Sequence, residues 1–348
     1  MDTIPPGVLA ALAGLAGGLI LGLSARLGDF CTLGALESAV YGADQRRLRL
    51  WGVVLGVAII GTFVSEALGF AEPTATFYHS IAWNPAASIV GGLIFGYGMA
   101  MAGNCGFGAL VRFGGGDLRS LVVVVVIGIF AFVTLSGPIA PLRAAIFPQT
   151  DATSPQGIAH WLAARTGLPP LAFALAMGLA VLAWGLSHAP LRQAKAKVAW
   201  GVAAGLSVVW CLVATSWLHE SSFGEIGVEG PSFTAPLGRT IIFFMTSTAG
   251  GVTFSVGIVS GVLLGAFAGS TIRGLFRWEA CEDPRELGRQ VSGAALMGIG
   301  GTLALGCSLG QGVTAMATLA FSAPVTLAAI VLGGMFGLRQ LIGGYQPD

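Results

Sequence analysis

Cysteine carries the most distinctive chemistry in this sequence, because two of the five cysteines lie in nearly matching glycine-rich stretches. Residues 103–112 read GNCGFGALVR around Cys105, and residues 306–312 read GCSLGQG around Cys307. A thiol is small and polarisable, donates a weak hydrogen bond and accepts soft partners. The flanking glycines allow backbone N–H groups to turn toward an anion. A row of such thiols suits a sulfur-containing anion better than water or a hard cation.

The other cysteines are judged by their surroundings. Cys31 follows Phe30 in a short apolar turn and is a third candidate. Cys211 lies in the apolar run SVVWCLVATSW, where a lone cysteine is ordinarily a small apolar filler, and Cys281 lies in a charged loop as an incidental thiol. The number of cysteines is odd and no CxxC pair occurs, so the sequence predicts neither a disulfide framework nor a metal site, and no cofactor.

Further residues near the thiols are candidates for a supporting role: Asn104, Gly106, Gly306, Gln311, Arg26 and Arg112. The two amides can donate hydrogen bonds to sulfonate oxygens, although such amides often only satisfy loop carbonyls. The two arginines can raise the local anion concentration, but arginine near the end of a membrane span is also an ordinary topological anchor.

The elements that position these residues belong to an all-α integral membrane protein. Of the 348 residues, 55% are hydrophobic and 9% charged, with a mean hydropathy of +0.82. An ordinary soluble domain devotes about a quarter of its residues to charges. Apolar runs recur along the whole sequence, so we expect one membrane domain over residues 1–348. The net charge of +1 gives no indication of nucleic-acid binding.

Nine apolar runs approach the roughly 20 residues that cross a bilayer as helix. They lie at about 7–25, 50–70, 86–103, 119–138, 169–187, 198–217, 251–270, 289–306 and 324–342. Four apolar stretches between them are too short to cross and are predicted to dip in and return on the same side: 28–42, 104–116, 236–250 and 307–323. Three of these re-entrant segments contain the candidate thiols.

The order of spans and short segments predicts an internal repeat. Residues 7–138 form the first unit, 169–187 is a linking span, and 198–342 repeats the order of the first unit. Residues 91–108 align with residues 293–310, and the alignment pairs Cys105 with Cys307 and four glycines with glycines. An odd number of spans separates the starts of the two units, so we expect inverted repeats that meet near the membrane midplane.

Basic residues predict the orientation. Of the 17 lysines and arginines, all but Arg143, Arg165 and Arg239 fall on one side of the predicted topology. The positive-inside rule makes that side cytoplasmic, with the N-terminus outside and the C-terminus inside. Cys31 and Cys105 would then enter from the cytoplasmic side and Cys307 from the outer side, so that their thiols form a short ladder across the thinnest part of the protein.

At GDFCTLGAL, GMAMAGNCGFGALVR and GCSLGQG, the sequence resembles the YeeE/YedE family of bacterial inner-membrane sulfur transporters. The resemblance spans about residues 20 to 340 and implies an hourglass of helices with loops dipping in from both faces. It implies import of thiosulfate by relay between three thiols, roles that would fall on Cys31, Cys105 and Cys307. It also implies a small cytoplasmic sulfurtransferase of the TusA-like kind as partner.

The sequence therefore predicts a thiosulfate permease, rather than an enzyme, in the bacterial inner membrane. Three alternatives stay open: transport of another sulfur or selenium species, a membrane thiol–disulfide oxidoreductase, and a structural scaffold for a sulfurtransferase. The absence of CxxC disfavours the oxidoreductase, because redox enzymes usually hold a vicinal pair of cysteines.

Overall fold

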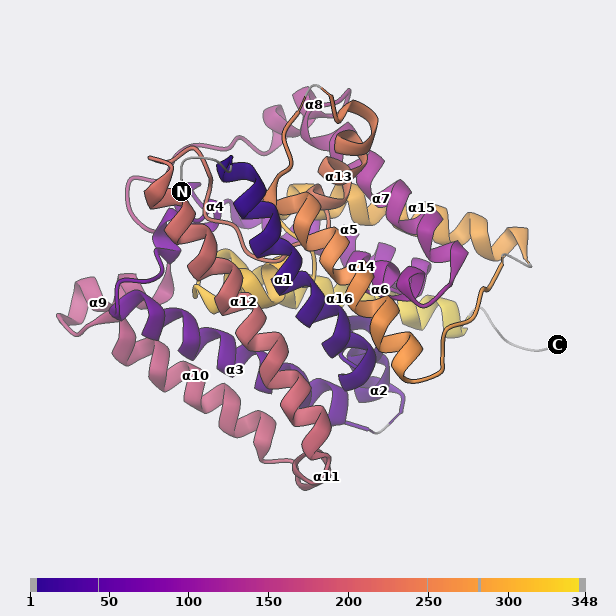
Figure 1. The fold of residues 1–348 in the computed structure, drawn as a ribbon, viewed down its shortest axis with the longest axis horizontal. Helices are drawn as coiled ribbons and strands as arrows, with labels where there is room; N and C mark the ends of the chain where they lie inside the picture. Colours follow the sequence, from indigo (N-terminus) through magenta and orange to yellow (C-terminus); the bar gives the residue numbers. More distant parts are fainter. Residues whose placement is uncertain (1–4, 43, 249, 281–282, 344–348) are drawn as a thin grey trace.

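The structure is a computed structural model that describes residues 5–42, 44–248, 250–280 and 283–343. Within those ranges every regular element is a helix, and the only β pairing consists of isolated bridges. Figure 1 shows long helices that cross the molecule at varied angles, with short helices between them. The predicted all-α membrane architecture is confirmed.

Nine long helices in the described part of the chain coincide with the nine predicted spans to within a few residues. They are α1 (Pro6–Gly28), α3 (Arg46–Ala67), α5 (Pro85–Ala102), α7 (Leu118–Leu135), α10 (Pro170–Leu186), α12 (Lys195–Ser221), α14 (Phe254–Ile272), α15 (Pro284–Leu303) and α16 (Ser322–Gly343). Seven stretches of the described chain are long and apolar enough to cross a membrane, and these contain every long helix except α10 and α15. Helix α10 has 17 residues, and α15 carries charged residues in its first turns.

Short helices occupy the four segments that the sequence predicts to be re-entrant. They are α2 (Thr32–Val40), α6 (Gly106–Gly114), α13 (Ala235–Thr246) and the π-helical turn η2 (Gly310–Ala315). The remaining short elements connect the long helices: η1 (Pro73–Ala75), α4 (Phe77–Ser80), α8 (Ala140–Ile146), α9 (Ile158–Thr166) and α11 (Ala189–Gln193). Even the longest of the first four, α13 with 12 residues, spans only about 18 Å at 1.5 Å per residue, which is too short to cross a bilayer.

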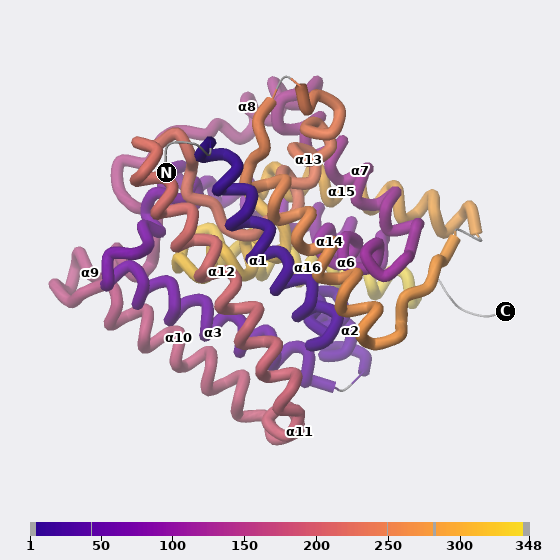
Figure 2. Tube along the Cα trace, in the orientation of Figure 1, coloured from indigo at the N-terminus to yellow at the C-terminus, as the bar shows by residue number. Residues whose placement is uncertain are grey.

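The long helices pack in pairs drawn from both halves of the sequence. Helix α1 runs beside α14, as Figures 1 and 2 both show, and α5 packs against α15 and α16. Helix α3 packs between α10 and α12, which leaves α10 along an edge of the molecule in Figure 2. The two halves of the chain are therefore interleaved rather than separate.

Glycines permit the closest of these contacts. A Cβ added to Gly98 would lie 2.5 Å from the carbonyl oxygen of Gly293, and one added to Gly293 would lie 2.6 Å from that of Gly98. Gly91 and Gly300 approach each other in the same way further along the same two helices. The residue numbers of the contacting glycines rise along α5 and fall along α15, so the two helices are antiparallel. Because glycine has no side chain, their backbones meet directly at these contacts.

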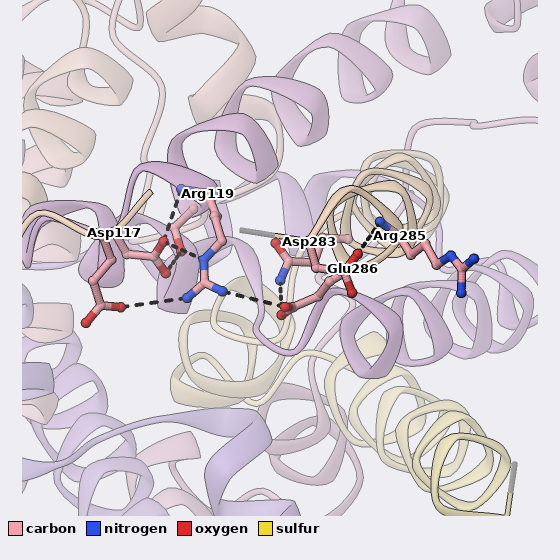
Figure 3. A network of polar contacts seen from close by, with 8 residues as sticks. Asp117, Arg119, Asp283, Arg285 and Glu286 are labelled. Carbon is pink, nitrogen blue, oxygen red and sulfur yellow. Dashed lines mark hydrogen bonds and ion pairs between the residues drawn. The ribbon is translucent and has the colours of Figure 1, made fainter. Parts of the chain in front are cut away.

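A polar network joins the N-terminus of α7 to the segment that leads into α15. The guanidinium of Arg119 lies 3.3 Å from Asp117, 3.7 Å from Glu279 and 3.6 Å from Glu286. Figure 3 shows Arg119 between the acidic residues of the two segments. Backbone bonds reinforce the junction, since the N–H of Leu118 donates to the carbonyl of Glu279. The network holds together one end of two helices that also pack along their length.

A second polar cluster lies between α4, α9 and the end of α3. The ring nitrogen Nε2 of His79 lies 3.2 Å from the carbonyl oxygen of Thr318, and Nε2 of His160 lies 2.9 Å from a carboxylate oxygen of Glu66. The two imidazole rings are 5.7 Å apart and nearly perpendicular. Burial, with a smaller contribution from His160, lowers the pKa of His79 from 6.5 to about 4.

We expect the pH dependence of stability to report this buried histidine. Because the folded protein holds His79 with a lowered pKa, the unfolded chain binds the proton more tightly between pH 4 and 6.5. The contribution of neutral His79 to the free energy of unfolding is therefore complete above about pH 6.5 and is lost as the pH falls toward 4. At pH 5 the loss is about 2 kcal/mol. Thermal unfolding of purified protein at pH 7 and pH 5 measures this loss of stability. His79→Gln should reduce the difference in stability between the two pH values, and an unchanged difference would show that His79 is not its source.

Candidate functional site

Each of the three candidate cysteines lies within three residues of the start of a short helical element. Cys31 is the N-cap residue of α2 and Cys105 that of α6, both with extended backbone angles, and Cys307 precedes η2. The sulfur of Cys105 accepts a hydrogen bond from the N–H of Gly108 at 3.3 Å, and the sulfur of Cys307 accepts one from Gly310, also at 3.3 Å. Both bonds connect a cysteine to the third residue after it. The matched sequence contexts thus produce matched local structures.

Two hydroxyl groups join the three cysteine-bearing segments. The thiol of Cys105 lies 3.9 Å from the hydroxyl of Thr32, the residue after Cys31. That hydroxyl donates at 3.3 Å to the hydroxyl of Ser308, the residue after Cys307. The segments that carry Cys31, Cys105 and Cys307 therefore meet, although they are far apart in sequence. Cys105 and Cys307 are each only 1% exposed, and Cys31 is partly exposed.

Cys307 has further partners on the segment that leads into α13. Its sulfur accepts a hydrogen bond from the N–H of Phe233 at 3.2 Å and lies 3.9 Å from the hydroxyl of Ser232. With Gly310, the buried sulfur of Cys307 therefore has three polar neighbours, two of them backbone N–H donors. Donors converging on one sulfur create a positive local field without a formal charge.

Aromatic rings pack where the cysteine-bearing segments meet. The ring of Phe107 lies 6.2 Å from that of Phe30 and 5.2 Å from that of Phe233, and all three side chains are buried. Phe30 precedes Cys31, Phe107 is two residues after Cys105, and Phe233 donates to Cys307. The thiols are therefore embedded in an apolar centre from which bulk water is largely excluded.

A cavity of about 400 Å³ reaches the neighbourhood of Cys307. Its wall is mostly apolar but includes Gly306 and the polar side chains of Ser232, Thr234 and Arg239, for which we call this space the polar cavity. The guanidinium of Arg239 forms an ion pair with Glu229, another lining residue, at 3.0 Å. A volume of this size is ample for a small oxyanion.

The two amides predicted to contact an anion differ in their surroundings. Gln311 is fully buried, and its amide nitrogen donates to the carbonyls of Ala304 and Leu305 at 2.7 and 3.3 Å. Its amide oxygen accepts from the hydroxyl of Ser322 at 3.1 Å. Gln311 therefore holds the backbone just before Cys307. Asn104 is 3% exposed, and its amide oxygen has no hydrogen-bond partner among the described residues.

The two predicted glycines make room for backbone turns. A Cβ at Gly106 would lie 2.5 Å from the carbonyl oxygen of Phe233, so glycine allows α6 to meet the segment before α13. Gly306 adopts a φ of 157° directly after Leu305, whose φ of 56° is also in the left-handed range. The chain thus reverses sharply at these two residues and presents Cys307 to the centre.

Arg26 lies in the last turn of α1, and Arg112 lies in the last turn of α6. Arg26 packs against the backbone at Gly115 and is close enough to Arg112 and Arg273 for electrostatic interaction. Its buried Nε has no hydrogen-bond partner among the described residues. Arg112 is also close enough to Cys31, at the start of α2, for electrostatic interaction.

The other two cysteines do not join this cluster. Cys211 is completely buried in α12, where its sulfur fills the space beside Gly17 of α1, as expected for an apolar filler. Cys281 lies outside the described residues. Within the part of the chain that the structure describes, no group of three or more His, Cys, Asp or Glu side chains is arranged to hold a metal ion.

Sequence reasoning missed the hydroxyl-bearing residues of the site: Thr32, Tyr78, Ser232, Thr234 and Ser308. Two signals were available. Thr32 and Ser308 directly follow candidate cysteines, and Phe233-Thr234 stands directly before the short helix α13 as Phe30-Cys31 stands directly before α2. Tyr78 had no signal, because it lies on a connecting segment that only the tertiary structure brings to Cys307.

These features define a multi-pass, all-α membrane protein with a buried thiol centre and a polar cavity beside it. The sequence matches the family described as Sulphur transport over residues 27–336. The chain belongs to that family, so the predicted resemblance to sulfur transporters is confirmed, and the family consists of transporters rather than enzymes.

Two characterised relatives cover nearly the whole chain. The thiosulfate transporter TsuA of Escherichia coli (strain K12) is 24% identical over 342 residues, which is 92% of each chain. The thiosulfate transporter TsuA of Spirochaeta thermophila (strain ATCC 700085 / DSM 6578 / Z-1203) is also 24% identical, over 332 residues that make up 92% of this chain and 96% of the relative.

Proposed function

We propose that this protein imports thiosulfate across the bacterial inner membrane by relay between the thiols of Cys307, Cys105 and Cys31. The observation that carries the proposal is the meeting of the three cysteine-bearing segments through Thr32 and Ser308, beside a cavity that reaches Cys307. The names of both relatives support thiosulfate as the substrate.

The relay follows from the chemistry of thiosulfate. Its terminal sulfur is soft and carries negative charge, so a thiol can donate an S–H···S hydrogen bond to it without forming a covalent bond. The ion would enter the polar cavity, bring its sulfur to Cys307, and pass it to Cys105 and then to Cys31. Helix α6 begins at Cys105 and helix α2 begins at Cys31, and the positive N-terminal end of each helix favours an anion there. Arg26 and Arg112 would then receive the ion.

Alternating access between inverted repeats would move the ion through the centre. The pairs of helices that pack together are related by an exchange between the two repeats. The exchange replaces the elements of the first repeat, in order, by those of the second: α1, α2, α3, α5, α6 and α7 by α12, α13, α14, α15, η2 and α16. For example, α1 with α14 becomes α12 with α3, and α5 with α16 becomes α15 with α7. The antiparallel glycine contacts of α5 and α15 are symmetric under the same exchange. This pattern supports a two-fold axis in the membrane plane, with the thiols close to it.

Uptake of radiolabelled thiosulfate into proteoliposomes tests the proposal. We expect saturable uptake that unlabelled thiosulfate competes away and that liposomes without protein do not show. Sulfite, hydrosulfide and selenosulfate as competitors identify the preferred species, and an imposed proton gradient reports the driving force. Complete absence of uptake both with and without the imposed proton gradient, with folded protein in the bilayer, would contradict thiosulfate transport.

A further inference from the structure

Ser232 and Thr234 line the polar cavity next to Cys307, and the hydroxyl of Tyr78 lies against Gly306, which is part of the same wall. The hydroxyls of Tyr78 and Thr234 are buried, in side chains 4% and 2% exposed, and neither has a hydrogen-bond partner among the described residues. Ser232 places its hydroxyl 3.9 Å from the sulfur of Cys307. Unpaired buried hydroxyls are costly in a folded protein and are explained when a ligand pairs with them.

Glycines before and after Cys307 lie against these hydroxyls. A Cβ at Gly310 would lie 2.7 Å from the hydroxyl of Ser232 and 3.1 Å from that of Tyr78. A Cβ at Gly306 would lie 3.4 Å from the Tyr78 hydroxyl, and one at Gly301 would lie 2.6 Å from that of Thr234. Gly301 and Gly306 are themselves joined by a backbone hydrogen bond of 2.8 Å and both line the cavity.

We propose that Tyr78, Ser232 and Thr234 form an oxyanion subsite that binds the sulfonate end of the transported anion while its terminal sulfur faces Cys307. This inference rests on the proposed function and extends it, because it assigns recognition of the oxygens to residues other than the thiols. Each hydroxyl supplies one O–H donor, and a sulfonate group offers three acceptor oxygens.

Neutral donors suit a transport site better than a fixed cation would. Arg239, the basic residue that lines the polar cavity, already forms an ion pair with Glu229. Hydroxyl donors in a low-dielectric setting hold an anion selectively, yet they leave no full charge to trap it. The subsite therefore requires oxygens on the ligand, so hydrosulfide, which has sulfur and no oxygen, should bind there poorly.

Tyr78→Phe and Thr234→Val test the subsite, because each removes one hydroxyl and preserves shape. We expect each variant to weaken thiosulfate binding and raise the KM for uptake about tenfold to a hundredfold, since a hydrogen bond to a charged ligand is lost. Inhibition of uptake by sulfite, which also carries oxygens, should weaken by a similar factor. The melting temperature without ligand should stay the same or rise, because an unpaired buried hydroxyl is removed.

Thr62→Val and Thr326→Val are matched controls. Both threonines are fully buried with hydroxyls that lack partners among the described residues, and neither lines the polar cavity. These variants should keep the affinity of the unmodified protein. If the unmodified protein binds thiosulfate and Tyr78→Phe and Thr234→Val bind it equally well, the subsite is refuted while the proposed function stands. If the unmodified protein neither binds nor transports thiosulfate, the proposed function itself fails.

Discussion

Replacing Cys307 by serine is expected to reduce thiosulfate uptake to the background of empty proteoliposomes, and Cys105→Ser is expected to do the same. A serine hydroxyl still accepts the hydrogen bonds that Cys307 receives from Phe233 and Gly310, so the local fold should persist. It lacks the large, polarisable sulfur that matches the terminal sulfur of thiosulfate. Uptake of radiolabelled thiosulfate, with melting temperature measured in parallel, is the test.

Alanine variants give a second measure of the same thiols. Cys307→Ala removes the acceptor for two buried N–H groups and should cost about 1–3 kcal/mol of stability for each of them, as well as abolishing uptake. Cys211→Ala is the matched control, because Cys211 is equally buried but lies away from the other thiols in α12. It should transport normally. Undiminished uptake by the serine variants of Cys105 and Cys307 would rule out a relay through these sulfurs.

Gln311→Leu is expected to abolish uptake by displacing Cys307. The change leaves the carbonyls of Ala304 and Leu305 and the hydroxyl of Ser322 without their present partner. Each buried polar group left unpaired costs about 1–3 kcal/mol, so we expect the variant to be several kcal/mol less stable. The sharp turn at Leu305 and Gly306 would then relax, and the thiol would leave the centre.

The measurements for Gln311 separate positioning from direct contact with the substrate. If Gln311 acts by holding the backbone, Gln311→Leu should lower the melting temperature. Cys307 should also be alkylated faster in this variant than in the unmodified protein, because its thiol becomes exposed. Gln311→Glu should be nearly as damaging, because a carboxylate cannot donate to the two carbonyls. A Gln311→Leu protein that melts and is alkylated as the unmodified protein but binds thiosulfate weakly would instead place the amide on the substrate.

Much of the architecture follows from the sequence, because the membrane leaves few choices. A chain with 55% hydrophobic residues in runs of span length must satisfy its backbone groups within helices, and the nine predicted spans coincide with nine long helices of the described chain. The segments around Cys105 and Cys307 were predicted to be re-entrant, since the apolar stretches there are too short to cross a bilayer. The thiols themselves were identified by their matched glycine contexts.

Only the tertiary structure decided what surrounds those thiols. The contact between Thr32 and Ser308 joins residues 276 positions apart, and no local pattern specifies it. The same holds for Tyr78, whose connecting segment packs against Gly306 and Gly310. The sequence left two roles open for the amide of Gln311, donation to an anion or to loop carbonyls, and the structure shows it donating to the carbonyls of Ala304 and Leu305. Local composition thus determines which segments are helical and which residues are reactive, whereas packing between distant segments determines which polar groups remain unpaired and available to a ligand.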